Sequence, residues 1–204
     1  GHGHLREPND IQSYSALACI AIQSNQNDQH GGQSIPNFDY GMAPGVAKTY
    51  SKLYRQNLVR ALELLSNIED VAALVNLISK KLADEDNVYP TLMPNEKYLE
   101  LEKKYLKEYI SDDAIIQRAQ TFAAEKAQEE TDRSTYQAME AFIHNMNTMH
   151  SRAGAQVPFS SINYGTDTSP EGRMVIKNIL LATEAGLGNG ETPIFPVHIF
   201  KVKE

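Results

Sequence analysis

Cysteine, tryptophan and long hydrophobic runs are scarce or missing in this sequence of 204 residues. The single cysteine, Cys19, excludes an internal disulfide and any metal site built from several thiolates. No apolar run approaches the ~18 residues of a membrane-spanning helix, and the N-terminal GHGHLREPND contains no apolar core of a signal peptide. We therefore expect no membrane partner and take the cytoplasm as the expected compartment.

Positive charge is also in short supply. The net charge is −7 and the isoelectric point is near 5.4, and no stripe of lysine and arginine is present to displace counterions from phosphate, so nucleic acid is not an expected partner. The six histidines do not have metal-site spacing. His144 and His150, for example, fall on different faces of a predicted helix. No metal site is expected.

Helical periodicity dominates the first three quarters of the chain. Apolar residues at spacings of three and four predict helices over residues 11–29, 46–65, 71–82, 96–109 and 113–150. Glycine and proline predict a structured loop over residues 30–45, and residues 84–94 also have the composition of a loop. Within the last helix the polar stretch EKAQEETDRST predicts either mid-helix exposure or a break.

The last fifty residues change character. Residues 156–165 are typical of a strand, and Ser169 followed by Pro170 is typical of a helix start. This helix should end at Gly186, and IFPVHIFKVK should form another strand. Strand, helix and strand at this spacing predict two parallel strands joined by a right-handed crossover. Because two parallel strands make no stable sheet alone, the domain should be incomplete.

The stretch NYGTDTSPEGR lies where such units bind ligands, beyond the end of a strand and at a helix N-terminus. Its hydroxyls and free amides suit an anion. Asp167 and Glu171, however, bring negative charge, so these residues can equally serve only to cap the helix. The glycines of GLGNG close a helix and precede no Lys-Ser/Thr pair, so Gly186 is predicted to be a C-cap and not part of a phosphate loop.

Two apolar features have ordinary structural interpretations. Cys19 lies mid-helix among alanines and isoleucines without a basic neighbour, which predicts a buried, unreactive thiol. Phe142, Met146 and Met149 recur at helical spacing and indicate a core or an interface more than a cofactor site.

Two long stretches carry a family resemblance. ALACIAIQSNQNDQHGGQSIPNFDYGMAPGV and MNTMHSRAGAQVPFSSINYGTDTSPEGRMVIKNILLATEAGLGNGETPIFPVHIFKVKE closely resemble the catalytic subunit of anaerobic (class III) ribonucleoside-triphosphate reductase. The resemblance implies a glycyl-radical enzyme that converts ribonucleotides to deoxyribonucleotides. It implies an α/β fold, a ten-stranded barrel, of which this chain is a partial, mostly helical slice ending in a βαβ unit. It also implies ATP or dNTP effectors, a homodimer, and an activase that installs the radical with S-adenosylmethionine.

The resemblance also predicts what this chain lacks. The family's two active-site cysteines and its radical glycine are expected outside residues 1–204, and Cys19 matches neither cysteine. We therefore expect no catalytic residue here and an isolated chain that is inactive. The domain prediction is a single incomplete domain over 1–204, with residues 11–150 mainly helical and 156–203 forming strand, helix and strand.

Site residues follow from the barrel and the family. Alternate residues of a barrel strand face inward, so one of two sets in PFSSINYG should line the substrate cavity, either Ser161 and Asn163 or Ser160 and Tyr164. Polar residues on a buried strand indicate a wet interior facing substrate. The loop hydroxyls and amides from Thr166 to Ser169 would suit the substrate triphosphate, and one basic residue matches a position near the effector phosphates. The predicted substrate-binding residues are Ser160, Ser161, Asn163, Thr166, Thr168 and Ser169, and the predicted effector-binding residue is Lys52.

A different class of function fits the same residues. The small-residue face of 11–29 and the Met/Phe stripe of 113–150 could belong to a non-catalytic helical dimerisation or interaction module, or to a fragment that only binds a nucleotide effector.

Overall fold

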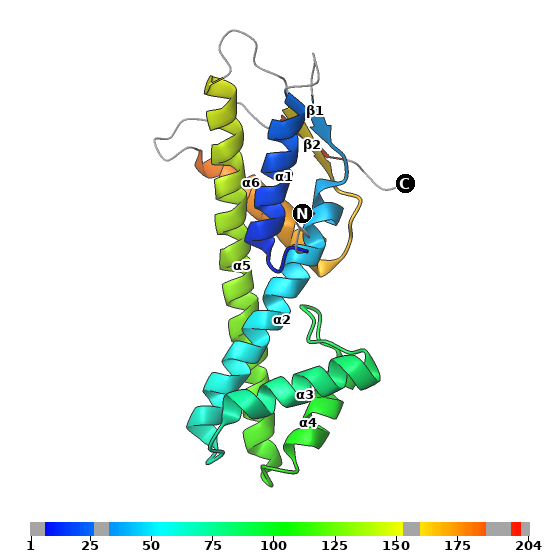
Figure 1. Cartoon of the computed structure of the whole chain (residues 1–204), viewed down its shortest axis with the longest axis vertical. Coiled ribbons are helices and arrows are strands. Elements are labelled where there is room, and N and C mark those ends of the chain that lie inside the picture. Colours follow the sequence, from blue (N-terminus) through cyan, green and yellow to red (C-terminus); the bar gives the residue numbers. More distant parts are fainter. Residues whose placement is uncertain (1–6, 27–32, 153–159, 187–196, 201–204) are drawn as a thin grey trace, which may run out of the picture. The chain divides into compact units, whose positions relative to one another are not determined.

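The computed structural model describes residues 7–26, 33–152, 160–186 and 197–200. The chain is mostly helical with a small three-stranded parallel sheet (Figure 1). Its elements are α1 (Ile11–Gln26), β1 (Gln33–Ile35), α2 (Phe38–Leu65), α3 (Val71–Asp86), α4 (Glu96–Leu106), α5 (Asp113–Arg152), β2 (Ser160–Tyr164), α6 (Pro170–Ala185) and β3 (Val197–Phe200). They divide into two compact units, residues 49–131 and the remainder, with the divisions falling inside α2 and α5. Whether both belong to one incomplete domain stays a prediction.

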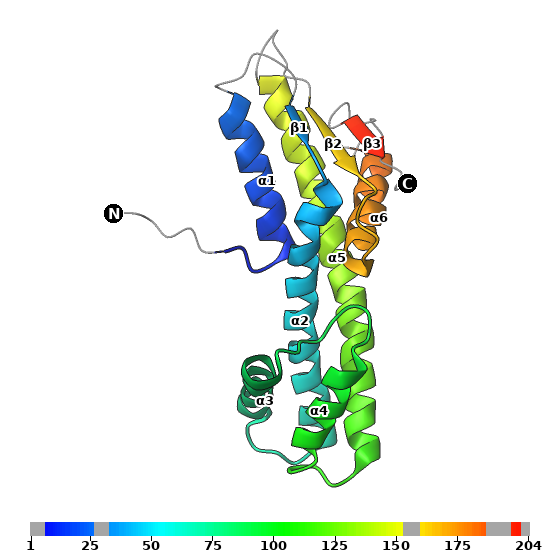
Figure 2. The same ribbon diagram turned by 90° about the vertical axis from the view of Figure 1, so that its right-hand side faces the viewer.

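The sheet belongs to the unit that contains both chain ends. Its strands lie in the order β1-β2-β3, and both pairings are parallel (Figure 2). Gln33 pairs with Ser160 at the start of β1, and Tyr164 pairs with Phe200 at the end of β3. The predicted strand, helix and parallel strand are thus confirmed for the described residues. Predicted strand residues 156–159, 194–196 and 201–203 lie outside them.

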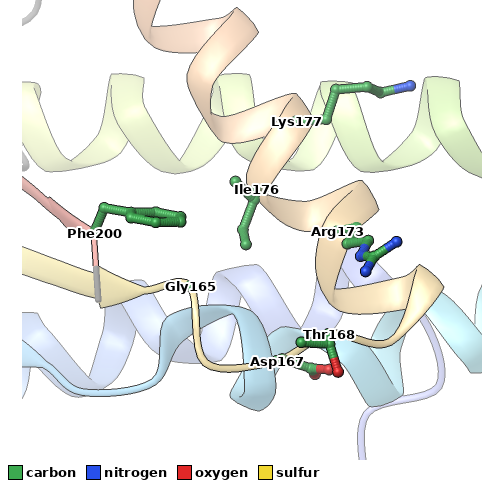
Figure 3. A pocket seen from close by; sticks show the side chains of 7 residues that line it. All are labelled: Gly165, Asp167, Thr168, Arg173, Ile176, Lys177 and Phe200. Carbon is green, nitrogen blue, oxygen red and sulfur yellow. The ribbon is translucent and has the colours of Figure 1, made fainter. Parts of the chain in front are cut away.

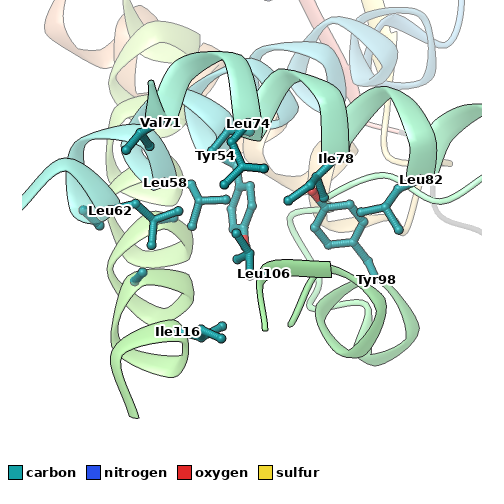
Figure 4. Close-up of a cluster of buried hydrophobic side chains, with 14 of the residues drawn as sticks. Tyr54, Leu58, Leu62, Val71, Leu74, Ile78, Leu82, Tyr98, Leu106 and Ile116 are labelled. Atoms are coloured by element: carbon teal, nitrogen blue, oxygen red, sulfur yellow. The ribbon is translucent and has the colours of Figure 1, made fainter. Parts of the chain in front are cut away.

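The other unit is a helical bundle with its own apolar core (Figure 4). It is built from the later part of α2, the two short helices α3 and α4, and the first part of α5. Asp70 caps α3 by accepting a hydrogen bond from the Ala73 amide at 3.0 Å. Asn95 caps α4 in the same way, because its Oδ1 accepts a hydrogen bond from the Tyr98 amide at 3.3 Å. These caps satisfy amides that a helix start leaves open.

The predicted loop over residues 30–45 is wrong in its second half, where α2 already begins at Phe38. The helix contains Pro44, which lacks an amide hydrogen and normally disfavours a helix interior. Phe38, Met42 and Val46 are buried at spacings of four, and the Phe38 ring lies 5.0 Å from that of Phe142. Burial of this stripe outweighs the local preference. The first half of the same segment contains β1, which the sequence analysis missed.

Helix α5 runs unbroken through the polar stretch for which a break was one alternative. Most of that stretch is exposed or partly exposed, but Ala127, Thr131 and Thr135 are buried at spacings of four. These small side chains maintain a packed stripe, so exposure without a break is the outcome. Helix α3 extends to Asp86, into the predicted loop, and α4 ends at Leu106, earlier than expected.

Among the described helices, none combines the length and apolarity that crossing a membrane requires.

Candidate functional site

Strand β2 ends at a sharp turn that leads directly into α6. Gly165 follows the strand with φ of 108°, a conformation that residues with a Cβ rarely adopt. Four residues later Ser169 caps the helix: its Oγ accepts a hydrogen bond from the Gly172 amide at 3.0 Å, and Pro170 occupies the first turn. The predicted cap is confirmed, and the loop Gly165–Ser169 is fixed at its helix end.

A buried carboxylate from α2 holds the strand end of the same loop. The side chain of Asp39 is fully buried. Its Oδ2 accepts hydrogen bonds from the backbone amides of Gly165 at 2.9 Å and Asp167 at 3.1 Å. Its Oδ1 accepts one from the amide of Tyr40 at 3.0 Å. Asp39 was not among the predicted site residues, because it lies in a stretch predicted to be irregular and is far along the chain from the loop.

Asp167 closes the loop against the first turn of α6. Its Oδ1 accepts a hydrogen bond from the Ser169 amide at 2.8 Å. Gly172 is buried beside it, and a Cβ there would lie 2.5 Å from the Asp167 Cγ. Glycine is therefore required for this close approach, which is tighter than real Cβ contacts allow. The negative charge of Asp167, noted in the sequence, therefore stabilises the loop itself through this hydrogen bond.

Some amides of the loop already donate a hydrogen bond within the protein, and others are available to a ligand. Those of Asp167 and Ser169 already donate to carboxylates. Within the described part of the chain, the amides of Thr166 and Thr168 have no acceptor, while the Thr166 hydroxyl donates to Asn37 Oδ1 at 3.3 Å. The predicted anion-binding groups are thus brought together, but only some of them are available.

The two faces of β2 differ in polarity. Ile162 and Tyr164 are buried on one face. That face is directed toward α6, because His198, which contacts the Tyr164 hydroxyl, also contacts Thr183 of that helix. The opposite face carries Ser161, which is buried, and Asn163, whose Nδ2 donates to Ser34 Oγ at 3.4 Å. The Oδ1 of Asn163 is buried and has no hydrogen-bond partner among the described residues. The side chain of the predicted residue Ser160 lies outside what the structure describes.

A pocket of about 330 Å³ opens between the loop, α6 and β3 (Figure 3). Phe200 and Ile176 face one another on one side, while Arg173 lies above Thr168 and Asp167 on the loop. Lys177 also lines it and forms an ion pair with Asp132 at 2.6 Å. Asp167 also lines the pocket and Asp132 already pairs with Lys177, so Arg173 is the cation that remains for a ligand. Arg173, the Thr168 hydroxyl and the Phe200 ring are groups that can hold an anionic ligand with an apolar part. Of the predicted site residues, Thr168 lines this pocket.

His198 is a further residue that sequence analysis did not single out. Its Nδ1 lies 3.2 Å from the Tyr164 hydroxyl and its Nε2 lies 2.9 Å from Thr183 Oγ1. Burial lowers the pKa of the His198 imidazole, which favours the neutral ring in the fold. The sequence offered one signal for this residue. His198 lies two positions before Phe200 on a predicted strand, which places both side chains on the same face of that strand. Both ring nitrogens are engaged, so the residue joins β3 to α6.

Lys52 belongs to a different compact unit from the loop. It is exposed on α2 in the unit formed by residues 49–131, whereas the other predicted site residues belong to the unit with the sheet. Its role near effector phosphates stays a prediction.

Cys19 and the histidines form no second site in the part of the chain that the structure describes. Cys19 is buried, as predicted, and burial raises the pKa of its thiol to about 11 against a weaker opposing hydrogen bond with Asn145. No group of three metal-ligating side chains occurs among the described residues. Phe142 and Met146 are fully buried, in agreement with a core role; the Met149 side chain lies outside the described set.

Polar groups gather beyond the end of a parallel strand, at the start of the following helix, which is the position where α/β proteins commonly bind small ligands. Comparison with known proteins is more specific. All 204 residues match the family of anaerobic ribonucleoside-triphosphate reductases, and the chain belongs to that family.

Curated relatives with that name agree over the whole chain. The protein of Enterobacteria phage T4 is 33% identical over 205 residues, which cover 100% of this chain and 24% of the relative. The proteins of Salmonella typhimurium and Escherichia coli are each 34% identical over 205 residues, covering 100% of this chain and 20% of each relative. The chain thus spans about a fifth to a quarter of the length of these relatives.

Proposed function

We propose that this chain forms part of an anaerobic ribonucleoside-triphosphate reductase that converts ribonucleotides to deoxyribonucleotides by glycyl- and thiyl-radical chemistry. Similarity to reductases along the entire chain supports this proposal. The resemblance assigns the radical glycine and the active-site cysteines to segments other than these residues. The contribution of this chain is therefore a binding surface, and the chemical groups that carry the radical come from elsewhere in the enzyme.

The sheet is proposed to be part of the family's ten-stranded barrel. The three strands are all parallel and are ordered as they occur in the chain, an arrangement that suits consecutive strands of a barrel wall. The polar and apolar faces of β2 support the same interpretation, because strands of a barrel alternate between the interior and the covering helices. On this proposal the face with Ser161 and Asn163 lines the interior, whereas Ser160 alternates with these two residues along the strand and is not assigned to that face.

The observation that carries the substrate proposal is the unpartnered Oδ1 of Asn163. A buried amide oxygen without a donor is costly, and a ligand hydroxyl would satisfy it. The ribose of a nucleotide provides such donors. Ser34 fixes the other end of the same amide group through a hydrogen bond to Nδ2, which orients the oxygen. We therefore propose that Ser161 and Asn163 bind the nucleoside part of the substrate.

The loop is proposed to bind the triphosphate. The amides of Thr166 and Thr168 are the donors left over by the loop's own hydrogen bonds, and the Ser169 hydroxyl accepts from Gly172 while its own proton remains for a phosphate oxygen. Arg173 adds a positive charge in the pocket that Thr168 lines. Hydroxyls, amides and a guanidinium together are typical ligands of phosphate.

Effector binding through Lys52, dimer formation through the outer helices, and activation by an S-adenosylmethionine-dependent partner are proposed from the family alone. Lys52 is exposed, as a residue that meets a soluble effector must be.

Calorimetric titration of the chain with ribonucleoside triphosphates and, separately, with dNTPs tests the proposal. Asn163→Ala should weaken ribonucleotide binding about tenfold through the lost hydrogen bond and leave dNTP binding unchanged. Lys52→Ala should weaken dNTP binding alone. Lys80→Ala removes an exposed lysine from the same unit and serves as the matched control. Absence of binding by the folded chain, or equal loss in all three variants, contradicts the proposed sites.

A further inference from the structure

Asp39 is a buried carboxylate whose partners are all backbone amides. Its side chain is completely inaccessible to solvent, and among the described residues no lysine, arginine or histidine forms an ion pair with it. Burying an unpaired charge is costly unless hydrogen bonds replace the lost water. Three amides provide this replacement, those of Tyr40, Gly165 and Asp167.

Capping of α2 does not account for this geometry. Only Oδ1 contacts the helix that contains Asp39, through the amide of the next residue. Oδ2 is devoted to the loop, whose amides lie 126 and 128 positions further along the chain. A capping residue would direct its oxygen to amides in its own first turn. The second oxygen of Asp39 therefore has a different role.

The two loop amides held by Oδ2 lie on either side of Thr166. With Gly165 and Asp167 both fixed, the direction of the Thr166 amide and side chain is set from both neighbours. The restraint continues through the Asp167 carboxylate to the Ser169 amide at 2.8 Å, and from Ser169 to the first turn of α6. Asp39 thus determines the course of the whole loop without reaching its ligand-facing side.

We propose that Asp39 is the positioning residue of the triphosphate-binding loop; this rests on the proposed function, which gives the loop its ligand. Asp39 touches no substrate. By holding two amides toward the protein interior, it leaves those of Thr166 and Thr168 in one fixed arrangement before the ligand arrives. Such preorganisation increases affinity because the loop loses less conformational freedom on binding.

The first test needs no substitution. Amide hydrogen exchange of the wild-type chain, followed by NMR, should show the amides of Gly165 and Asp167 at least about tenfold better protected than those of Thr166 and Thr168, since only the former pair donates to a buried acceptor. Equal exchange at all four positions overturns the proposed anchoring.

The second test replaces the carboxylate. Asp39→Asn keeps the side-chain volume but removes the charge and one acceptor. It should raise exchange at Gly165 and Asp167 and weaken binding of the four ribonucleoside triphosphates about tenfold. Asp10→Asn is the matched control, because Asp10 also accepts a backbone amide at a helix start, that of Ser13 at 2.7 Å, without touching the loop. Asp39→Glu, which keeps the charge but displaces it, should release the loop as well and guards against a variant that fails to fold.

Inorganic triphosphate, titrated alongside the nucleotides, shows which part of the ligand depends on Asp39. Loss of its binding in Asp39→Asn together with loss of nucleotide binding supports the inference. Unchanged nucleotide binding despite a released loop overturns the positioning role and leaves the proposed function standing. If the wild-type chain binds no triphosphate at all, the proposed function fails and with it the positioning role, whereas the exchange pattern still decides whether Asp39 anchors the loop.

Discussion

Replacing Glu102 with alanine should strongly destabilise the helical unit formed by residues 49–131. Glu102 lies on α4 and is buried, and its partners Tyr54 and Tyr98 belong to the core shown in Figure 4. Its Oε1 accepts hydrogen bonds from the Tyr54 hydroxyl of α2 at 2.6 Å and from Gln120 Nε2 of α5 at 3.1 Å. Its Oε2 accepts one from the Tyr98 hydroxyl at 2.6 Å. One carboxyl group therefore joins three helices.

The magnitude follows from what each partner loses. Glu102→Ala leaves two buried tyrosine hydroxyls without this acceptor, at about 1–3 kcal/mol each, and also removes packed side-chain atoms. Gln120 keeps its second acceptor, the Leu99 carbonyl, at 3.0 Å. We expect a total loss of about 3–5 kcal/mol. Glu102→Gln keeps the shape but replaces one of the two acceptor oxygens with a donor, and it should cost about 1 kcal/mol near the pH at which the glutamate is protonated.

The pH dependence has a definite sign. Burial raises the pKa of Glu102, and the hydrogen bonds from Tyr54, Tyr98 and Gln120 oppose this only in part. The folded chain thus retains a proton that the unfolded chain releases. The contribution of Glu102 to stability is complete below the pKa that this residue has in the unfolded chain. It is lost as the pH rises through the higher pKa of the folded chain, by at most about 1.4 kcal/mol per pH unit. Glu102→Gln removes this slope.

Urea denaturation followed by circular dichroism, repeated across the acid range, measures both effects. The chain has ten tyrosines and no tryptophan, so its intrinsic fluorescence reports on all the tyrosines together, Tyr54 and Tyr98 among them. Glu100→Ala, an exposed glutamate of the same helix, is the control and should change the free energy of unfolding by less than about 0.5 kcal/mol. A Glu102→Ala cost below about 1 kcal/mol, or identical pH slopes for wild type and Glu102→Gln, would contradict the role assigned to the Glu102 carboxyl group.

Two further substitutions or modifications test the packing. Gly172→Ala should destabilise by about 1–2 kcal/mol in denaturation, because the clash with Asp167 exceeds the gain in helix propensity. Gly41→Ala in α2, where a Cβ meets nothing within 4 Å, should stabilise by about 0.5–1 kcal/mol, and stabilisation at both glycines contradicts the assigned contact. Cys19 should react with a thiol reagent at about pH 8 roughly a hundredfold more slowly in the folded chain than in denaturant, since its pKa is raised to about 11; equal rates would show that it is accessible.

Local signals predicted much of this fold. The helix caps and the 3.6-residue period placed the described helices within a few residues at most ends, and Ser169-Pro170 gave the start of α6 correctly. Strand, helix and strand at short spacing gave a parallel pairing, which the structure has. These features depend on residues close together in the chain, and sequence patterns report such interactions well.

Interactions between distant residues account for what was missed. Helix α2 begins at Phe38 despite Pro44 because Phe38 packs on Phe142, a contact that no local pattern reveals. Asp39 lies in the same misjudged stretch, so its carboxylate was not considered for the loop. The sequence predicted a ligand site at this loop, which stays a prediction, and it did not reveal which loop amides the protein itself occupies.

Asp39 and Glu102 show why a buried carboxylate must be interpreted through its donors. Neither has a cationic partner among the described residues. Glu102 receives side-chain donors from helices, so its loss should change the stability of a core and nothing at the loop. Asp39 receives backbone donors from a loop at the end of a parallel strand, so its loss should change the arrangement of that loop more than the packing around it. Burial alone would place both residues in the same category. On the proposed function, the chemical identity of the donors separates a residue that stabilises the fold from one that prepares a binding surface.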